Sequence, residues 1–367
     1  MRRRRSARLG WLLLALAAAW VYQTLQPTPP PPAAPGEATL FFLPQAGRTA
    51  EDFLIARMNE ARASLEVAAL ELDNTRLAYA LVSAAARGVP VRLYTDRDYQ
   101  DEARAALVAA AHGQRQGRPT PSQETVRRTV RPLGEGCEAI ARVRVCYDNR
   151  NALMHHKFVV LDGQAVWTGS ANLTYNGFFR NNNDVLYLPS PPLARGYRAE
   201  FEALWTGTRR GLGRAVPFRL ENAEGTAYFS PAGGEAALEA ILARLAASRE
   251  EVWVLAFVLT EERLIQALAA AHARGVRVRV LLETRNLIHS REENLPRGVE
   301  LRQDTNPYQM HHKLMVIDRS WVITGSFNFS RSAYTRNNEN LLVLHSPALA
   351  ERYRKEAERL WRTATPL

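Results

Sequence analysis

The chain has 367 residues, of which 46% are apolar and 23% charged; this composition is typical of globular domains and excludes a chain that is disordered throughout. Its formal net charge is +11, and such a basic excess suits a phosphate-bearing partner, either a nucleic acid or an anionic lipid. Charge alone does not choose between these two partners.

The first 36 residues differ from the rest of the chain. Five arginines precede an apolar run, Leu9–Tyr22, and a proline-rich segment follows at Pro27–Pro35. This order is typical of a secretion signal or an N-terminal anchor followed by a stiff linker. The apolar run is shorter than the roughly 20 residues that span a bilayer comfortably, so both possibilities stay open. We therefore expect an exported protein: periplasmic, secreted or anchored to the outer face of the cytoplasmic membrane. A basic tail on a cytosolic protein is the less favoured alternative.

The remaining chain repeats one succession of elements. In the first half, residues 37–208, we expect strands at Thr39–Leu43, Leu65–Leu70, Val89–Tyr94, Arg142–Tyr147, Phe158–Leu161, Ala165–Trp167 and Val185–Leu188. In the second half, residues 223–367, we expect strands at Thr226–Phe229, Val252–Val258, Val276–Glu283, Val299–Arg302, Leu314–Ile317, Trp321–Ile323 and Leu341–Leu344.

Expected helices separate these strands. One begins at a possible capping box, Thr49–Asp52; Ala-rich helices end at Gly88 and Gly275; closing helices span Leu193–Leu204 and Pro347–Trp361. The alternation predicts an α/β fold: two tandem α/β/α sandwich halves, each a mixed sheet covered by helices. Residues 207–222 are the expected join.

The first half has a longer connection between Asp96 and residue 154 than the second half has at the equivalent place. Residues 112–123 of this connection have loop composition. Cys137 and Cys146 lie just beyond and are the only cysteines. An exported chain can pair them, so we predict a disulfide; two independent small core residues are the alternative.

One nine-residue motif is written twice, with a shift of 156 residues. MHHKFVVLD, Met154–Asp162, returns as MHHKLMVID, Met310–Asp318, and each copy leads into a G-S-x-N sequence. Although the chain has 48 basic residues, it has only three lysines, and two of them, Lys157 and Lys313, lie in these copies. A compact ammonium kept at these two places suggests a charge aimed at a small group.

In an extended segment, alternate side chains share a face, so each motif presents an imidazole beside an ammonium. His155 with Lys157, and His311 with Lys313, would form two such walls. Asn172 and Asn328, after the Gly-Ser turns, can add amide donors. Two facing walls make a donor-rich site suited to a tetrahedral phosphate, in which one neutral imidazole attacks phosphorus and the other, protonated, gives a proton to the leaving oxygen.

Other interpretations of these residues are weaker. The adjacent histidines could ligate zinc, but a lysine beside them would repel a cation, so we expect neither a metal nor another cofactor. His156 and His312 face the opposite side and are expected to be structural. Five residues are expected to support the site: Asp162, Ser170, Asp184, Asp318 and Ser326. The two aspartates that end the motifs are expected to fix the turn or to pair a basic group.

The doubled HxKxxxxD and GSxN pattern resembles the phospholipase D superfamily, which includes phospholipases, cardiolipin synthases and bacterial nucleases. The resemblance covers nearly all of the chain after the proline-rich segment. It implies two halves related by a pseudo-twofold axis, one shared active site, a phosphohistidine intermediate and no metal.

The resemblance also implies residue roles. It makes His155 the nucleophile and His311 the general acid. The family has an acidic residue late in the motif that orients a histidine; Glu339 matches it in the second copy, whereas the first copy has Asn183 there, with Asp184 next to it. We expect Glu339 to hold His311, which leaves the partner of His155 open.

The function expected is a metal-independent phosphodiesterase of the phospholipase D type, acting by hydrolysis or by transfer on phospholipids, with an exported nuclease as the alternative. A membrane surface is a possible partner. Because both motifs lie in one chain, we expect a monomer. A non-enzymatic phosphate-binding protein is disfavoured because neither copy has lost its His or Lys.

Overall fold

The computed structural model describes residues 36–117 and 119–367. The predicted signal or anchor lies, apart from Gly36, outside the described residues. Within them, no helix is both long enough and apolar enough to cross a bilayer.

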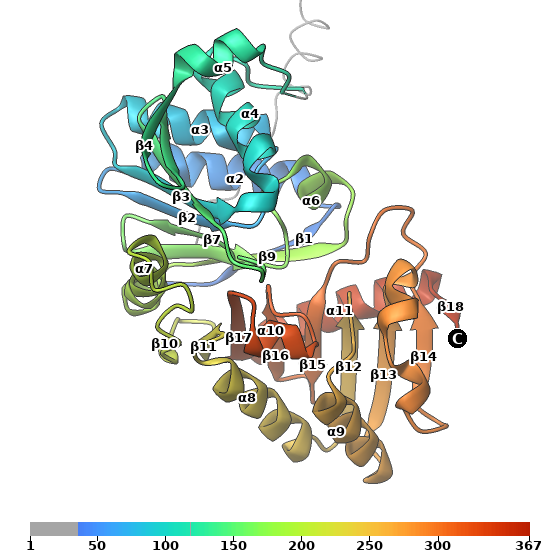
Figure 1. Cartoon of the computed structure of the whole chain (residues 1–367). Coiled ribbons are helices and arrows are strands. Elements are labelled where there is room, and N and C mark those ends of the chain that lie inside the picture. The colour runs from blue at the N-terminus through green and yellow to red at the C-terminus, as the bar shows by residue number, and fades with distance from the viewer. Residues whose placement is uncertain (1–35, 118) are drawn as a thin grey trace, which may run out of the picture. The chain divides into compact units, whose positions relative to one another are not determined.

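Two nine-stranded sheets form the framework, one from each half (Figure 1). The first sheet has, in spatial order, β1 (Thr39–Leu43), β9 (Asn183–Leu188), β8 (Ala165–Gly169), β7 (Lys157–Leu161), β2 (Leu65–Ala69), β3 (Val91–Asp96), β6 (Val143–Asp148), β5 (Cys137–Ile140) and β4 (Val130–Gly134). The second has β10 (Val216–Arg219), β11 (Glu224–Ser230), β17 (Glu339–His345), β16 (Trp321–Gly325), β15 (Lys313–Ile317), β12 (Glu251–Ala256), β13 (Arg277–Leu282), β14 (Glu300–Gln303) and β18 (Thr365–Pro366).

Both sheets are mixed in the same way. In the first, β2 pairs in parallel with β3, and β3 with β6, whereas β7, β8, β9 and β1 are antiparallel. The second repeats this pattern with β12, β13 and β14 in parallel and β15, β16, β17 and β11 antiparallel. The central strands read as continuous apolar runs because both faces are covered.

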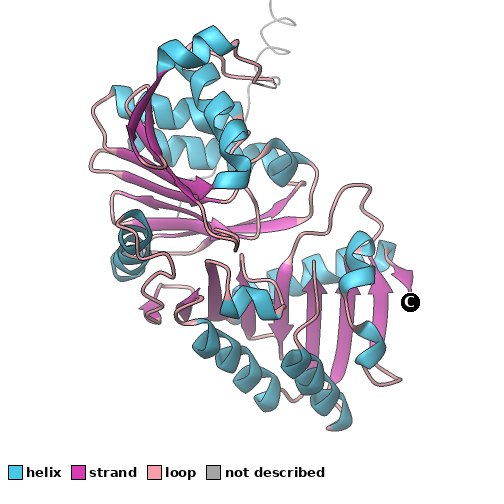
Figure 2. Cartoon of the chain, viewed as in Figure 1, coloured by secondary structure: helices cyan, strands magenta, loops and turns pink. Residues whose placement is uncertain are grey.

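Helices cover both faces of each sheet (Figure 2). The first half contributes α2 (Gly47–Glu60), α3 (Thr75–Ala86), α4 (Gln100–Ala111), α5 (Gln123–Thr129), α6 (Tyr175–Phe179) and α7 (Pro191–Trp205). The second contributes α8 (Gly234–Ala247), α9 (Glu262–Ala273), α10 (Arg331–Thr335) and α11 (Pro347–Thr363). Short 3-10 turns are η1 (Arg97–Tyr99), η2 (Thr284–His289) and η3 (Glu292–Asn294).

Three apolar clusters fill the spaces between these layers. One joins α2, α3 and α4 to the outer face of the first sheet, and another joins α8 and α9 to the outer face of the second. The third contains residues of α7 and α11 and of both sheets, so the two halves share one continuous core. The predicted fold class, two tandem α/β/α halves, is confirmed.

Two local expectations were wrong or incomplete. The helix expected to open with a capping box at Thr49 begins earlier, at Gly47, without a side-chain cap. Asp52, the acidic residue of the expected box, pairs instead with Arg76 of the next helix, with 2.6 Å between Oδ1 and Nη1. The join, 207–222, is not all loop, because β10 inside it pairs with β11 as an edge strand of the second sheet.

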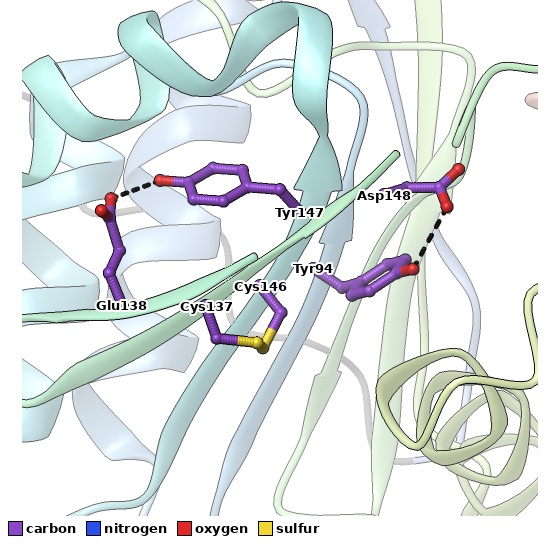
Figure 3. The surroundings of a disulfide bond; sticks show 6 residues. All are labelled: Tyr94, Cys137, Glu138, Cys146, Tyr147 and Asp148. Carbon is purple, nitrogen blue, oxygen red and sulfur yellow. Dashed lines mark hydrogen bonds between the residues drawn. A yellow bond between two sulfur atoms is a disulfide. The ribbon is translucent and has the colours of Figure 1, made fainter. Parts of the chain in front are cut away.

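The long connection of the first half folds into α4, α5 and the β4–β5 hairpin, which extends the sheet beyond β6 (Figure 3). Cys137 and Cys146 are cross-strand partners and form a disulfide, as predicted. Beside the disulfide, the Tyr147 hydroxyl donates to Glu138. The Tyr94 hydroxyl donates to Asp148, at the end of β6, over 3.3 Å.

Candidate active site

Each motif enters the site along a segment that pairs with the opposite half. Met154 bridges Asn338, and the His155 amide donates to the Asn338 carbonyl over 2.9 Å. By the same pattern Met310 bridges Asn182, and the His311 amide donates to the Asn182 carbonyl over 2.9 Å. The backbone itself therefore brings the two motifs together at the seam between the halves.

Carboxylates at the ends of β3 and β13 fix where these segments start. Asp96 accepts the Met154 amide over 2.8 Å, and Glu283 accepts the Met310 amide over 2.5 Å. Strands β7 and β15 begin only at the lysines, so the histidines precede the strands rather than lie in them.

His155 is held by a carboxylate from the other half. Its Nδ1 lies 2.6 Å from Oε2 of Glu339, at the start of β17, and both side chains are buried. Since a carboxylate can only accept, the Nδ1–H donates to it, and this leaves the Nε2 lone pair available.

This contact corrects the expected pairing of Glu339. The sequence placed Glu339 in the second copy, and we expected it to hold His311. The pseudo-twofold arrangement instead sets the late residues of each half beside the motif of the other half, so that Glu339 holds His155.

His311 has an amide where His155 has a carboxylate. Its Nδ1 lies 2.9 Å from Oδ1 of Asn183, at the start of β9. The amide orientation is fixed because Nδ2 of Asn183 donates to the Gly177 carbonyl and Oδ1 accepts from the Ser170 hydroxyl. The His311 Nδ1–H is therefore the donor, and Nε2 is the nitrogen that can bind a second proton.

The two lysines are buried and have matching contacts. Lys157 Nζ donates to the His155 carbonyl over 2.9 Å, and Lys313 Nζ donates to the His311 carbonyl over 2.7 Å. Among the described residues each ammonium makes only this one hydrogen bond, although it has three N–H groups. Lys313 also lies over the ring of Phe257, with Nζ 4.6 Å from the centroid.

Burial and mutual repulsion shift the pKa values of this cluster. Burial, with the positive charges of the two lysines, lowers the pKa of His155 and of His311 well below the ordinary value. Burial also lowers the pKa of Lys157 to about 8 and that of Lys313 well below 10.5. Burial raises the pKa of Glu339 to about 7. Both histidines are therefore neutral at pH 7.

The residues of the G-S-x-N sequences tie the turn after β8 or β16 to the neighbouring strand. Ser170 Oγ accepts the Asp184 amide over 3.0 Å, and Ser326 Oγ accepts the Asn340 amide over 2.9 Å. A Cβ on Gly169 would lie 2.2 Å from the Asp184 carbonyl oxygen, so only glycine permits this approach.

Asn172 and Asn328 are half-buried in matching positions of the two halves. Among the described residues, the buried Oδ1 atom of each lacks a hydrogen-bond partner. An amide oxygen only accepts, so Oδ1 could bind a donor of a ligand, while Nδ2 of the same amide is the atom that could donate to a phosphate oxygen.

The second histidine of each motif has a structural role. His156 and His312 are completely buried. His312 Nδ1 lies 2.9 Å from Asp184, and His156 Nδ1 lies 3.5 Å from Asn340. Asp184 also accepts from Thr324 and Tyr353, so it braces the second half and does not contact His155 or His311 by any hydrogen bond among the described residues.

The aspartates that end the motifs lie at the far ends of their strands. Asp162 accepts the backbone amides of residues 62–64, and Asp318 accepts those of residues 249–251. Both have positive φ, 53° and 48° respectively, and turn the chain into the next strand. They tie the hairpin to the preceding loop rather than act on the site.

Two residues that sequence reasoning missed connect the halves on either side of the motifs. Arg150 is held by Asp148 and donates to the Arg336 carbonyl and to Oδ1 of Asn338, beside Glu339. Asn306 occupies the equivalent place in the second half. The 156-residue shift, extended back from the motifs, would have found both positions.

The equivalent contacts of Asn306 are neutral. Its Nδ2 donates to the Arg180 carbonyl over 3.1 Å and to Oδ1 of Asn182 over 2.6 Å, while its backbone amide donates to Asp304. The contact between the halves at each motif is called a seam. The two seams thus have the same geometry but a different charge, because an arginine lies beside Glu339 and an amide lies beside Asn183.

Comparison with known proteins identifies the family. The sequence profile described as "Cardiolipin synthase, PLD-like domain" matches residues 54–205 and 241–361. Mitochondrial cardiolipin hydrolase of Homo sapiens is 33% identical over 136 residues, 36% of this chain and 54% of the relative. Phospholipase D of Rickettsia bellii is 34% identical over 138 residues, 37% of this chain and 68% of the relative. The chain thus spans about half the length of the human relative that it matches.

A solved structure shows the same fold over most of the chain. Phosphatidylserine synthase of Haemophilus influenzae superposes with a TM-score of 0.62 at 12% identity, over 89% of this chain and 87% of that one. The matched relatives are named a cardiolipin hydrolase and a phospholipase D, which agrees with the predicted enzyme class, a phosphodiester hydrolase. Because the profile matches both halves, the chain belongs to the phospholipase D-like family.

Proposed function

We propose that this protein is a phosphodiesterase of the phospholipase D type that cleaves phospholipids through a phosphohistidine on His155, without a metal. The observation that carries the proposal is the different bonding of the two neutral histidines, one to a carboxylate and one to an amide, beside two buried lysines. Among the described residues, no group of three or more His, Cys, Asp or Glu side chains is arranged to hold a metal ion.

In the first step, Nε2 of His155 attacks phosphorus and the bond from phosphorus to the head-group oxygen breaks. Glu339 stabilises the positive charge that develops on the attacking imidazole. His311, protonated at Nε2 once the anionic phosphate is bound, gives that proton to the leaving oxygen. Lys157 and Lys313, with the amides of Asn172 and Asn328, hold the non-bridging oxygens.

In the second step, water replaces the head group. The neutral His311 now removes a proton from the water as its oxygen attacks phosphorus, and the bond from phosphorus to His155 breaks. One water is consumed, the products are a phosphatidate and a free alcohol, and both histidines return to their starting states. An alcohol in place of water would give transfer rather than hydrolysis.

The names of the matched relatives, cardiolipin hydrolase and phospholipase D, support a lipid substrate. So does an acidic side chain beside the first lysine. The Leu70 amide donates to the His156 carbonyl, and Leu72 forms a β-bridge with Leu173. Glu71 therefore lies between the first motif and the segment that follows its Gly-Ser turn, and its charge acts on Lys157. The equivalent position in the second half is Val258. A carboxylate there disfavours a polyanionic strand.

The test is an assay of the purified protein, with EDTA present, against phospholipids and against single- and double-stranded DNA in parallel. Head-group release that EDTA does not inhibit, together with an acid-labile phosphoryl adduct on His155, is the expected result, and His155→Ala is the control. Cleavage of DNA but not of lipid would make the protein a nuclease. Loss of activity with EDTA would overturn the metal-independent mechanism.

We also propose that the body of the protein works outside the cytoplasm. The order of charged, apolar and proline-rich segments before residue 37 supports export. The disulfide adds support, because such bonds persist in oxidising compartments. Cell fractionation should find the protein in the periplasm, in the medium or at the membrane, and full-length protein free in the cytoplasm would contradict this.

A further inference from the structure

Large exposed apolar side chains gather near one seam of the site. Ile288 is 84% exposed, Tyr175 is 53% exposed and Tyr308 is 40% exposed. These three lie on three separate segments, η2, α6 and the segment that precedes the second motif.

Two arginines connect these segments. The Arg180 guanidinium lies over the Tyr175 ring, 5.3 Å from the centroid, and over the Tyr308 ring, 4.8 Å from the centroid. Arg285 donates to the carbonyl of Pro307, the residue before Tyr308, and Ile288 is one turn further along η2. We call these five residues, Tyr175, Arg180, Arg285, Ile288 and Tyr308, the arginine–aromatic rim.

The rim lies beside the segment that carries His311, the proposed general acid. Arg180 is two residues before Asn182, whose carbonyl accepts the His311 amide, and the Asn182 amide donates to the Gln309 carbonyl. Tyr308 is therefore one residue from the backbone pairing that carries His311 into the site.

The duplication supplies an internal comparison for the rim. Shifted by 156 residues, Arg180 corresponds to Arg336, Tyr175 to Arg331 and Tyr308 to Ala152. The same fold is thus built at the other seam without either tyrosine. The rim is therefore not a requirement of the fold, and exposing its apolar side chains to water needs another explanation.

We propose that the arginine–aromatic rim docks this protein onto the surface of a phospholipid bilayer, so that a lipid head group reaches the site from the side of His311. The inference rests on the proposed phospholipid substrate and adds where the bilayer binds. Tyrosine and isoleucine insert below the head groups, while guanidinium groups bind the phosphates above them.

A bilayer fits the rim better than a nucleic acid does. Bases would have to stack on the tyrosine rings, but the Arg180 guanidinium already lies over both of them.

The first experiment measures directly whether the rim inserts into a bilayer. The sequence has two cysteines and both are in the disulfide, so Ile288→Cys provides a single site for an environment-sensitive dye. On vesicles of phosphatidylethanolamine and phosphatidylglycerol, the dye emission should shift to the blue. Leu133→Cys, at an exposed leucine in β4, is the matched control and should not shift. An unshifted dye at residue 288 in the presence of bound vesicles overturns the proposal, whatever the N-terminal segment does.

The second experiment separates docking from chemistry. Ile288→Ser with Tyr308→Ser should lower hydrolysis of vesicle lipid by roughly ten-fold or more, because two apolar contacts with the bilayer are lost. Hydrolysis of a soluble bis-aryl phosphodiester should stay within about two-fold of the wild type, since neither residue takes part in the chemistry. Leu133→Ser is again the control.

The outcomes are distinguishable from failure of the proposed function. Equal losses on both substrates would mean a structural defect and overturn the docking role. If the wild type hydrolyses no phospholipid, the function fails, and the dye shift still decides the docking. Single-stranded oligonucleotide binding that the double variant loses, without vesicle binding by the wild type, would assign the rim to nucleic acid instead.

Discussion

The two proposed catalytic histidines, His155 and His311, have the same backbone setting but different partners. Each half gives the other one carboxylate and one amide, in opposite order: Asn183 then Asp184 from the first half, Glu339 then Asn340 from the second. The carboxylate of the second half reaches His155, whereas that of the first half reaches the structural His312. The carboxylate and the amide stand in opposite order in the two copies, and this difference makes the site asymmetric.

This asymmetry matters because the two steps of the proposed mechanism need opposite properties of an imidazole. A carboxylate on Nδ1 favours the positively charged state that His155 would pass through as the proposed nucleophile. A neutral amide on Nδ1 stabilises that state less, so a protonated His311 gives up its proton more readily. A duplication within one chain allows the two copies to diverge in this way.

The side chains packed around the two histidines differ as well. Phe257 packs edge-on against His311, with ring centroids 4.7 Å apart, and its equivalent in the first half is Leu70. Glu71 and Val258 form another unlike pair. The first half of the site is therefore the more acidic and the second the more apolar.

The largest test of this comparison removes each histidine in turn. His155→Ala should abolish turnover of every substrate, because no covalent intermediate can form. His311→Ala should slow phospholipid cleavage by on the order of a hundred- to ten-thousand-fold, yet spare a bis-aryl phosphodiester, whose leaving group needs little protonation. Single-turnover rates on both substrates give the answer. An adduct trapped on His311 in the wild type would reverse the two roles.

Exchanging the partners should have the next largest effect. Glu339→Gln keeps the shape but removes the charge, and should slow formation of the phosphohistidine by roughly a hundred-fold for both kinds of substrate. Asn183→Asp should instead make His311 a weaker acid and slow only substrates with poor leaving groups. If Glu339→Gln showed the leaving-group dependence, the carboxylate would be serving acid catalysis instead.

The pH profile of turnover should be bell-shaped, with the acid limb set by Glu339 and the alkaline limb by Lys157. Below about pH 7 Glu339 becomes protonated and His155 loses the charge that supports attack; above about pH 8 Lys157 loses its proton and its hold on the phosphate. Each limb should approach ten-fold per pH unit. Glu339→Gln should remove the acid limb and Lys157→Arg should move the alkaline limb upward. An alkaline limb that Lys157→Arg leaves in place would belong to another group.

A smaller effect is expected from the two seam residues. Arg150→Ala should loosen the segment that carries Glu339 and lower kcat by about ten-fold on the bis-aryl diester with little change in KM. Asn306→Ala, its matched control, should affect mainly the phospholipid, because it supports the side of His311. Arg150→Lys keeps the charge and should recover part of the rate. Identical profiles for the two alanine variants would mean that both residues only stabilise the fold.

Much of the fold was predictable because the sequence is internally repeated. The apolar runs that became β2, β7, β12 and β15 fixed the strands, and the 156-residue shift fixed which side chains are equivalent. The contact of Glu339 with His155 was not predictable. The repeat shows which residues of the two halves correspond, but not that a residue of one half binds the histidine of the other half. The capping box failed for a similar reason, because its expected acidic residue, Asp52, pairs with Arg76, which is distant in sequence.

The least effect on catalysis, and one confined to stability, is expected from the disulfide, which is present in the first half alone. Replacing Cys137 and Cys146 by serine should lower the free energy of unfolding by about 2 to 3 kcal/mol, because the bond closes only a short loop. Turnover of the soluble diester well below the melting temperature should not change, since β6, which carries Cys146 and Asp148, stays paired with β3. Thermal unfolding of the variant beside the wild type with and without reductant measures the loss. Two free thiols in unreduced, denatured wild type would show that the bond does not form, and a fall in turnover would mean that the hairpin helps Asp148 to hold Arg150.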